Sequence, residues 1–312
     1  MRGPADRFTS LSRYSTACER AAGEIIDVYS TSFGAATRML GRRHRGHVRN
    51  IYALVRIADE LVDGATDEAR IPPAEQHTLL QMLEDETDRA VRSGYSSNPI
   101  VHAFARTARA SGIGVDLTGP FFESMRSDLP SETTGTEGPE ADAAHTPTSG
   151  LDDTAHARYV YGSAEVVGLM CLRVFLRQET RTPDERRILE HGARRLGAAF
   201  QNVNFLRDLA DDSDRLGRSY LTENGRVDAE LQKQWIATIR EQLADASASL
   251  PLLPADARVA VGCALRLFSR LTDRLAAVPA EQLYQRRVRV PAPEKAWLAA
   301  RAAVEYRTGR FA

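Results

Sequence analysis

Apolar side chains recur every three or four residues along almost the whole chain, which is the spacing of one face of an α-helix. This pattern predicts helices over residues 14–40, 47–63, 75–93, 99–110, 115–127, 155–177, 184–212, 228–249, 255–277 and 294–308. Prolines fall between most of these segments, where helices are expected to end or begin. No segment alternates strongly enough to predict a strand, and no βα pattern carries a GxGxxG or P-loop motif. We therefore expect an all-α fold, with one domain (residues 1–312) whose long helices surround a central catalytic cavity.

Residues 129–153 lack this periodicity. They are rich in Thr, Gly, Pro, Ser, Glu and Asp and contain almost no large apolar side chain. Such a segment cannot bury enough surface to offset the entropy lost on ordering. We interpret it as a disordered surface insertion within the single domain.

The composition describes a globular protein without a bias towards nucleic acid. The 312 residues are 43% hydrophobic, enough for a sizeable core, and 41 basic side chains nearly balance 42 acidic ones. The three cysteines are widely spaced and form no CxxC pair, which favours a reducing cytoplasm over a disulfide framework or a zinc site.

Membrane signals in the sequence are weak. Residues 1–12 lack the apolar segment of a secretion signal. The most apolar run, Val166–Leu176, is broken by Arg173 and is shorter than the ~20 residues that span a bilayer. We expect a cytoplasmic protein without an integral segment, for which peripheral membrane contact through an apolar portal stays compatible with the sequence.

A polar stripe crosses the otherwise apolar segment 196–212. At helical spacing, one face carries two amides and two carboxylates, namely Gln201, Asn204, Asp208 and Asp212. Two carboxylates ~6 Å apart repel by roughly 3 kcal/mol at an effective dielectric of about 20, so a buried stripe needs cations. Arg207 and Arg215 are the nearby positive charges, and all-oxygen ligands suit Mg²⁺ shared with a phosphate. The alternative is an amphipathic helix with an acidic outer face.

The same construction occurs a second time, in the predicted helix 47–63. Asp59 and Asp63 lie four residues apart, with Arg56 one turn before them and apolar residues on either side. Two such stretches make a metal and phosphate site more probable than either stretch does alone.

Further segments carry a resemblance to a known family: Ser30-Thr31-Ser32-Phe33, the stretch YVYGSAEVVG at 159–168, and Arg218-Ser219-Tyr220-Leu221. Together with the paired acidic motifs, they resemble the squalene/phytoene synthase family, and within it the bacterial phytoene synthases. The resemblance runs from about Tyr29 to Lys295. It implies an isoprenoid synthase fold and a prenyltransferase of carotenoid biosynthesis. This enzyme would condense two geranylgeranyl diphosphates head to head, through a cyclopropylcarbinyl diphosphate, to phytoene.

The resemblance also implies roles for individual residues. It implies Mg²⁺, with Mn²⁺ as an alternative, on Asp59, Asp63, Asn204, Asp208 and Asp212, assisted by Asp211. It implies substrate binding by Ser30, Ser32, Tyr52, Arg56, Gln201, Asn204, Arg207, Arg218, Tyr220, Arg287 and Lys295. The catalytic set is Asp59, Asp63, Asp208 and Asp212 with Tyr159, whose ring and phenol can stabilise a carbocation or transfer a proton. No nicotinamide cofactor is expected.

Three features have two interpretations each. Glu165 stands where many relatives have Gly, so it either faces the reaction cavity or points elsewhere. The small residues before Thr37 suit close helix packing, or they leave room for a C20 tail in preference to C15. The basic run Arg42–Arg49 is a solvated loop, or it steers diphosphate or contacts anionic lipid.

Alternative functions remain at this point. The same chemistry on a C15 donor would give squalene, dehydrosqualene or hydroxysqualene. A chain-elongating prenyltransferase or terpene cyclase would more typically carry a DDxxD motif. A non-catalytic helical assembly or binding protein would be expected to have lost acidic residues, yet both motifs are intact. The expected partners are prenyl diphosphates, with geranylgeranyl diphosphate preferred and downstream carotenoid enzymes as candidates; nucleic acid is not expected.

Overall fold

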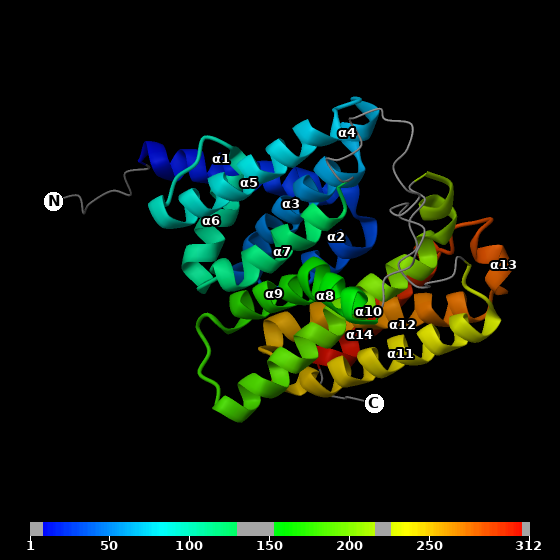
Figure 1. The fold of residues 1–312 in the computed structure, drawn as a ribbon. Coiled ribbons are helices and arrows are strands. Elements are labelled where there is room, and N and C mark those ends of the chain that lie inside the picture. Colours follow the sequence, from blue (N-terminus) through cyan, green and yellow to red (C-terminus); the bar gives the residue numbers. More distant parts are fainter. Residues whose placement is uncertain (1–8, 130–152, 216–225, 308–312) are drawn as a thin grey trace, which may run out of the picture.

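The computed structural model describes residues 9–129, 153–215 and 226–307, which fold into helices without a strand (Figure 1). Within these ranges the side chains of residues 31, 32, 153, 211–215 and 307 are not described. The predicted all-α fold is confirmed. Of the predicted insertion, residues 130–152 lie outside the described residues, whereas Leu129 is buried in the core and so belongs to the preceding helical unit.

The first half of the chain forms α1 to α7, drawn in blue to blue-green in Figure 1. These helices are α1 (Ser10–Tyr29), α2 (Thr31–Arg38), α3 (Arg42–Asp63), α4 (Ala65–Glu68), α5 (Pro73–Ser93), α6 (Pro99–Ser111) and α7 (Val115–Ser127). Side chains cap several of their first turns: Thr9 accepts a hydrogen bond from Ser12 N, and Asn98 accepts from Ile100 N. Gly94 ends α5 with a φ of 82°, a conformation that favours glycine.

The second half begins with α8 (Asp153–Val160), the π-helical turn η1 (Tyr161–Glu165) and α9 (Val166–Leu176). It continues with α10 (Pro183–Arg215), α11 (Ala229–Ser249), the 3₁₀ turn η2 (Leu250–Leu252), α12 (Ala255–Ala276), α13 (Ala280–Leu283) and α14 (Ala292–Arg307). In Figure 1, α8 and α9 lie between the first set of helices and the yellow to red helices of the C-terminal part.

Two predicted helix boundaries are wrong. The predicted helix 14–40 is divided at Ser30, which has extended backbone angles (φ −139°, ψ 106°) and whose hydroxyl accepts a hydrogen bond from Phe33 N at 3.0 Å. This local cap competes with helix continuation. The second error concerns α3, which begins at Arg42 rather than at residue 47, so the basic run predicted as a loop is its first two turns.

The core runs through the middle of the molecule, where α9 and η1 pack against α3, α7 and α10. Large side chains from these helices are fully buried, among them Ile51, Leu54, Phe121, Phe122, Met170 and Leu206. At Gly162 a Cβ would lie only 2.4 Å from the backbone oxygen of Pro120, so η1 and α7 approach as closely as a glycine allows. The close packing expected for the small residues of segment 159–168 is therefore present.

One continuous helical stretch, Thr154–Leu176, is long and apolar enough to cross a membrane, with a mean hydropathy of 1.4. It is longer than the apolar run seen in the sequence because α8, η1 and α9 join without a break. A core helix passes the same test, and Val166, Met170 and Val174 pack in the core. The stretch is therefore weak support for a membrane span.

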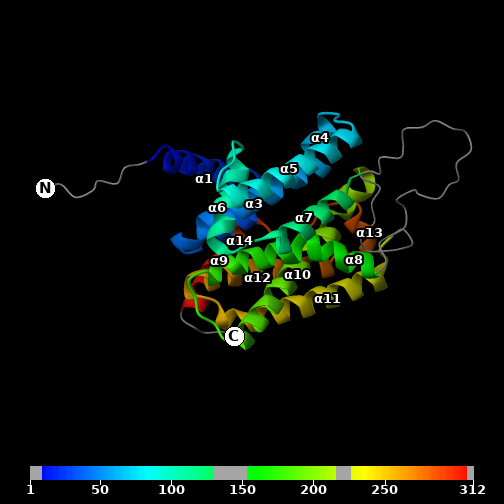
Figure 2. The same ribbon diagram turned by 60° about the vertical axis from the view of Figure 1, so that its left-hand side comes forward.

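The fold positions the two acidic motifs at the same end of the molecule. Asp59 and Asp63 lie in the last turns of α3, and Asp208 and Asp212 lie in the last turns of α10. Figure 1 and the turned view in Figure 2 both place the C-terminal ends of α3 and α10 on the same side. Chain segments separated by about 150 residues in the sequence thus end on the same side of the molecule.

Candidate active site

The end of α3 concentrates negative charge around one arginine. Arg56 Nη1 donates to Asp59 Oδ2 at 2.6 Å, and Arg56 Nη2 donates to Glu60 Oε1. The pKa of Asp59 is raised to about 6, chiefly by burial; Arg56 lowers it, and repulsion from Asp63 and Glu60 adds to the rise. The Asp59 side chain is nevertheless 43% exposed, so a ligand in solvent can reach it. Three carboxylates, Asp59, Glu60 and Asp63, therefore lie close together at this helix end, and Arg56 pairs with two of them.

The junction between α1 and α2 lies directly beside this acidic end. The Arg56 guanidinium lies 4.4 Å from the centre of the Tyr29 ring. The Tyr52 phenol hydrogen-bonds the Ser30 side chain, and burial raises the pKa of that phenol. The Tyr52 ring stacks on Phe33 with centroids 5.6 Å apart. The structure thus brings together Ser30, Tyr52, Arg56 and Asp59, four of the predicted site residues, whereas the Ser32 side chain lies outside the described residues.

Near the end of α10, the described neighbours of Asp208 include several cations. Asp208 accepts from Arg207 Nε at 2.8 Å and from Arg207 Nη2 at 2.5 Å. It also pairs with Arg287, at 2.7 Å to Nε and 3.2 Å to Nη2. Burial and the nearby cations Arg289 and Arg207 lower the pKa of Lys295. Two arginines therefore hold Asp208, and Lys295 lies close enough to Arg207 and Arg289 for their charges to interact; such a group of cations attracts phosphate oxygens.

Arg289 is a member of this group that the sequence reasoning missed. It follows Arg287 by two residues in a segment between α13 and α14 that is neither helix nor turn over residues 287–291. In extended chain, alternate side chains point to the same side. That spacing, Arg-Val-Arg-Val, is the signal from which Arg289 could have been found.

The structure describes some of the remaining predicted site residues of α10 and of the segment after it, but not all of them. The Gln201 and Asn204 side chains are half-buried and have no hydrogen-bond partner among the described residues, which leaves both amides available to a ligand. Asp212 lies one turn beyond Asp208 in α10, but its side chain, like that of Asp211, is not described. Arg218 and Tyr220 lie outside the described residues.

Tyr159 lies on α8 and its hydroxyl donates to Asp128 Oδ2 at 2.7 Å. Asp128 is only 6% exposed and follows the last residue of α7. The Tyr159 ring packs 5.9 Å from that of Phe205, whose helix also carries Asp208. Asp128 was not predicted, because a single Asp before a polar segment has no distinguishing pattern.

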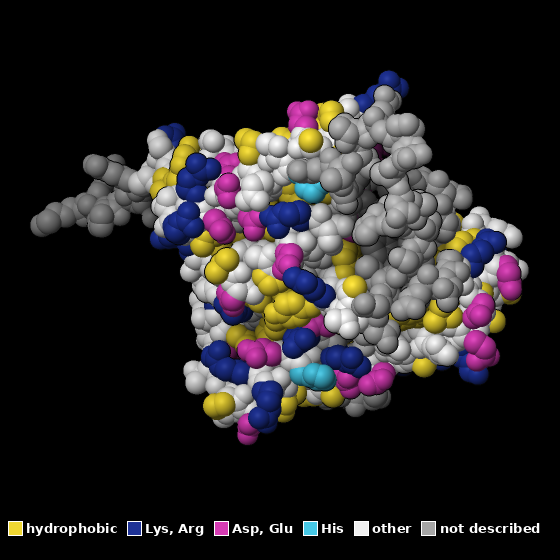
Figure 3. Space-filling model, viewed as in Figure 1, with side chains coloured by type: hydrophobic (Ala, Val, Ile, Leu, Met, Phe, Trp, Pro, Cys, Tyr) yellow, Lys and Arg dark blue, Asp and Glu magenta, His cyan; other side chains and the backbone are white. Residues whose placement is uncertain are grey.

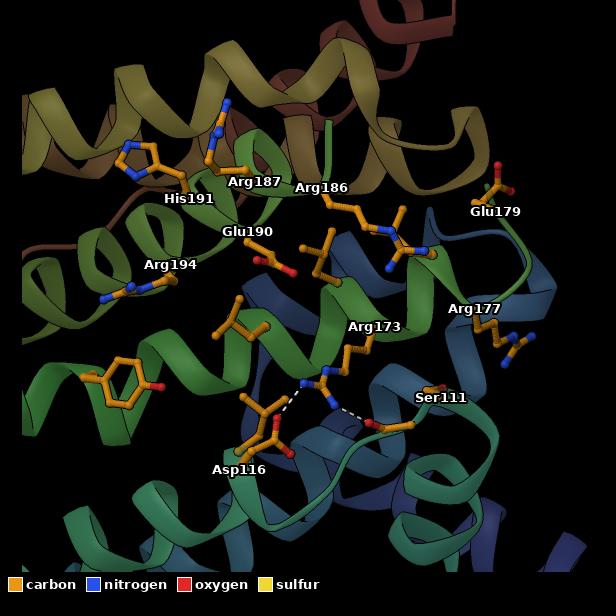
Figure 4. A pocket seen from close by; sticks show the side chains of 16 residues that line it. Ser111, Asp116, Arg173, Arg177, Glu179, Arg186, Arg187, Glu190, His191 and Arg194 are labelled. Carbon is orange, nitrogen blue, oxygen red and sulfur yellow. Dashed lines mark hydrogen bonds and ion pairs between the residues drawn. The ribbon is translucent and has the colours of Figure 1, made fainter. Parts of the chain in front are cut away.

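The Glu165 side chain pairs with Arg194 of α10. Of its two interpretations, the one in which it does not face the reaction cavity therefore holds. Its Oε2 accepts from Arg194 Nε at 2.6 Å, and Arg194 lies 5.2 Å from the Tyr161 ring centre. Arg194 and Tyr161 both line a groove of about 870 Å³ between α7, α9 and α10, shown in Figure 4. In this groove Arg173 donates to Asp116 at 2.5 Å and to the Gly112 carbonyl. None of the predicted site residues lines it, so this groove is separate from the acidic helix ends.

Thr37 is buried at 2% exposure, and its hydroxyl donates to the Phe33 carbonyl at 2.8 Å. This geometry is that of a helix-packing residue. A role in selecting the length of a prenyl tail stays a hypothesis.

The residues at the two helix ends fit a divalent cation. Among the described residues no three His, Cys, Asp or Glu side chains converge into a complete metal cage. Mg²⁺ needs no such cage, since it is usually held by one or two carboxylates, waters and substrate phosphate. Asp59 and Asp63 on α3, and Asn204 and Asp208 on α10, offer oxygen ligands only. Burial raises the pKa of Asp59, and a bound cation would offset this penalty on its ionised form.

Known proteins share this architecture. A family profile described as squalene/phytoene synthase matches residues 26–225. The 15-cis-phytoene synthase of Pantoea ananas is 26% identical over 310 residues, covering 93% of this chain and 92% of that protein. The 4,4'-diapophytoene synthase of Staphylococcus haemolyticus is 27% identical over 200 residues, covering 64% of this chain and 60% of that protein. A crystal structure of a dehydrosqualene synthase has the same fold, with a TM-score of 0.72 at 19% identity and coverage of 95% of this chain and 99% of that chain.

The all-α fold is an isoprenoid synthase fold, and the family and its relatives show that the enzyme is a prenyltransferase. The chain belongs to the squalene/phytoene synthase family. The resemblance inferred from the sequence motifs is thereby confirmed.

Proposed function

We propose that this enzyme condenses two molecules of geranylgeranyl diphosphate head to head to phytoene, with release of diphosphate. One observation carries the proposal. The end of α3 has clustered carboxylates, including Asp59, and near the end of α10 the Asp208 carboxylate is held by Arg207 and Arg287. The relatives named phytoene synthase support the choice of product, because the similarity to one of them spans nearly its whole length.

Two groups of side chains act in the ionisation of an allylic diphosphate: cations that stabilise the leaving group, and hydrogen-bonding groups that orient it. Arg207, Arg287 and Lys295 bind the phosphate oxygens and offset the charge that develops on the leaving group. Arg56 does the same from α3, and Ser30, Tyr52 and Gln201 orient the diphosphate by hydrogen bonds. The proposed roles of Ser32, Arg218 and Tyr220 are of this kind too. Mg²⁺ bound between the carboxylates would supply further positive charge against the leaving diphosphate.

The carbon chemistry takes place between the two helix ends. The allylic cation is captured by the double bond of the second donor, and loss of a proton from C1 of the ionised donor closes the ring of a cyclopropylcarbinyl diphosphate. A second ionisation and a rearrangement then join the two C1 carbons, and loss of a proton gives the hydrocarbon. Tyr159 is placed beside the reacting carbons in this proposal. Its phenol donates a hydrogen bond to the buried Asp128 carboxylate. Apolar side chains around the site exclude water that would quench the cations.

A C15 donor is the second candidate. It is favoured by the likeness to a 4,4'-diapophytoene synthase and by the fold shared with a dehydrosqualene synthase. We propose that a single domain carries out the reaction in the cytoplasm, with peripheral membrane contact as the route for the apolar product. Downstream carotenoid enzymes are the proposed recipients.

The test is a competition assay. Purified enzyme with Mg²⁺ receives equal concentrations of geranylgeranyl and farnesyl diphosphate, without NADPH, and the hydrocarbons are separated by mass. A predominant C40 product is expected. A predominant C30 product would keep the mechanism and replace the donor, and no hydrocarbon from either donor would reject the proposal.

A further inference from the structure

A basic pocket lies between α1 and α3, which pack side by side (Figure 1). Its volume is about 350 Å³. Four arginines line it: Arg20 from α1, and Arg42, Arg45 and Arg49 from α3. The three on α3 are spaced three and four residues apart and therefore share one helix face. None of these arginines belongs to the predicted site.

Two glycines inside helices give this pocket its shape. Glycine within a helix costs about 1 kcal/mol relative to alanine, so its presence calls for a reason. A Cβ at Gly23 of α1 would lie 3.3 Å from Arg49 Nη1, which means that Gly23 makes room for this guanidinium. A Cβ at Gly46 of α3 would meet nothing within 4 Å, so Gly46 faces the open space of the pocket.

The protein itself holds part of this basic group in place. Arg45 Nη2 donates to the carbonyls of Arg38 and Leu40, at 2.6 and 3.0 Å. The Nε atoms of Arg45 and Arg49 are buried out of reach of solvent, so a ligand in the pocket would contact these guanidinium groups only through their Nη atoms. The Arg45 guanidinium is therefore positioned before any ligand arrives.

The acidic residues of the pocket offset its charge only in part. Three of them line it, namely Glu19, Glu24 and Asp27. Glu19 pairs at 3.7 Å with Arg106 and Asp27 pairs at 3.4 Å with Arg38, and neither of these arginines lines the pocket. Glu24 is then the remaining carboxylate against four arginines. The pocket is net positive.

We propose that this pocket binds a phosphate-bearing anion of the size of a diphosphate, at a site separate from the candidate active site. Arg49 precedes Arg56 by seven residues on α3, which corresponds to ~10 Å along the helix. The pocket is too small for a C20 chain and suits a head group. The anion is either a substrate or product diphosphate or the head group of an anionic lipid. Only the first of these sources rests on the proposed function.

The test measures inorganic pyrophosphate binding by titration calorimetry in the presence of EDTA. Arg49→Gln is expected to weaken one binding event by about tenfold or more, because it removes a charge-assisted contact. Gly46→Leu, which fills the pocket and keeps its charge, is expected to weaken the same event. The matched control Arg89→Gln removes an exposed arginine on α5 and is expected to change it less than twofold.

Sedimentation with phosphatidylglycerol vesicles separates the two sources. Pyrophosphate binding that depends on Arg49, without vesicle binding, identifies a soluble diphosphate. Vesicle binding that depends on Arg49 identifies a lipid head group. If neither probe responds to Arg49→Gln, or if Arg287→Gln alone abolishes all pyrophosphate binding, the pocket is not an anion site. Hydrocarbon formation by the wild-type enzyme would leave the proposed function standing in that case.

Discussion

Asp59→Asn is expected to make the metal-free enzyme more stable while it removes most turnover. The rise in the pKa of Asp59 from the ordinary 3.8 to about 6 corresponds to about 3 kcal/mol against the ionised form in the folded state. Because 43% of the side chain is exposed, solvent screening reduces this penalty, and we expect a gain of about 1 kcal/mol.

The sign of the pH dependence follows from the direction of this change. An acid whose pKa is raised by folding destabilises the fold when it is ionised, so the penalty is complete above pH about 6 and vanishes below about 4. The advantage of Asp59→Asn should therefore be present at neutral pH and absent in acid. Urea unfolding in EDTA, followed by circular dichroism at both pH values, measures it.

Asp256→Asn is the matched control with the opposite sign. Hydrogen bonds from Arg43, at 2.7 and 2.9 Å, lower the pKa of Asp256 to about 2. Its ionised form stabilises the fold above pH about 4, and this contribution is lost as the pH falls towards 2. This variant should lose about 1 kcal/mol at neutral pH. An Asp59→Asn variant that is destabilised to the same degree at neutral pH would refute the reasoning, because Asp59 would then be a structural carboxylate.

Three further variants test other parts of the site. Arg287→Gln removes one of the two guanidinium groups on Asp208 and should raise the KM for the prenyl diphosphate about tenfold. An unchanged KM would show that Arg287 does not bind the substrate. Tyr159→Phe removes the hydroxyl that donates to the buried Asp128 and should lower the unfolding free energy by about 1–2 kcal/mol, measured by urea titration; an unaltered midpoint would show that the contact is dispensable. Deleting residues 131–150 should leave the melting temperature and turnover near those of the wild type, and a collapse of either would contradict their interpretation as a surface insertion.

The sequence was sufficient for what depends on periodicity and local spacing. Helix after helix follows from apolar residues at three- and four-residue intervals, and both acidic motifs were found because their carboxylates lie one turn apart. The division at Ser30 was missed, since a serine within a helical pattern reveals its capping bond only when the backbone is known. The early start of α3 was missed because arginines carry no apolar signal.

Long-range pairing accounts for what the sequence did not show. The ion pair between Arg287 and Asp208 joins residues 79 positions apart, and no local pattern specifies it. The same holds for Glu165, whose partner Arg194 lies on another helix. It also holds for Asp128, whose role is visible only from the hydrogen bond that it accepts from Tyr159. Family resemblance supplied Arg287 and Lys295, but their convergence with Arg289 required the fold.

The most direct measurement compares product formation by the wild type, Asp59→Asn and Asp208→Asn, each incubated with Mg²⁺ and geranylgeranyl diphosphate and analysed by mass. We predict a C40 hydrocarbon from the wild type without NADPH, and a loss of about a hundredfold or more in each variant with an unchanged helical circular dichroism spectrum. Near-normal C40 formation by both variants would contradict the central claim, because the acidic ends of α3 and α10 would then be structural.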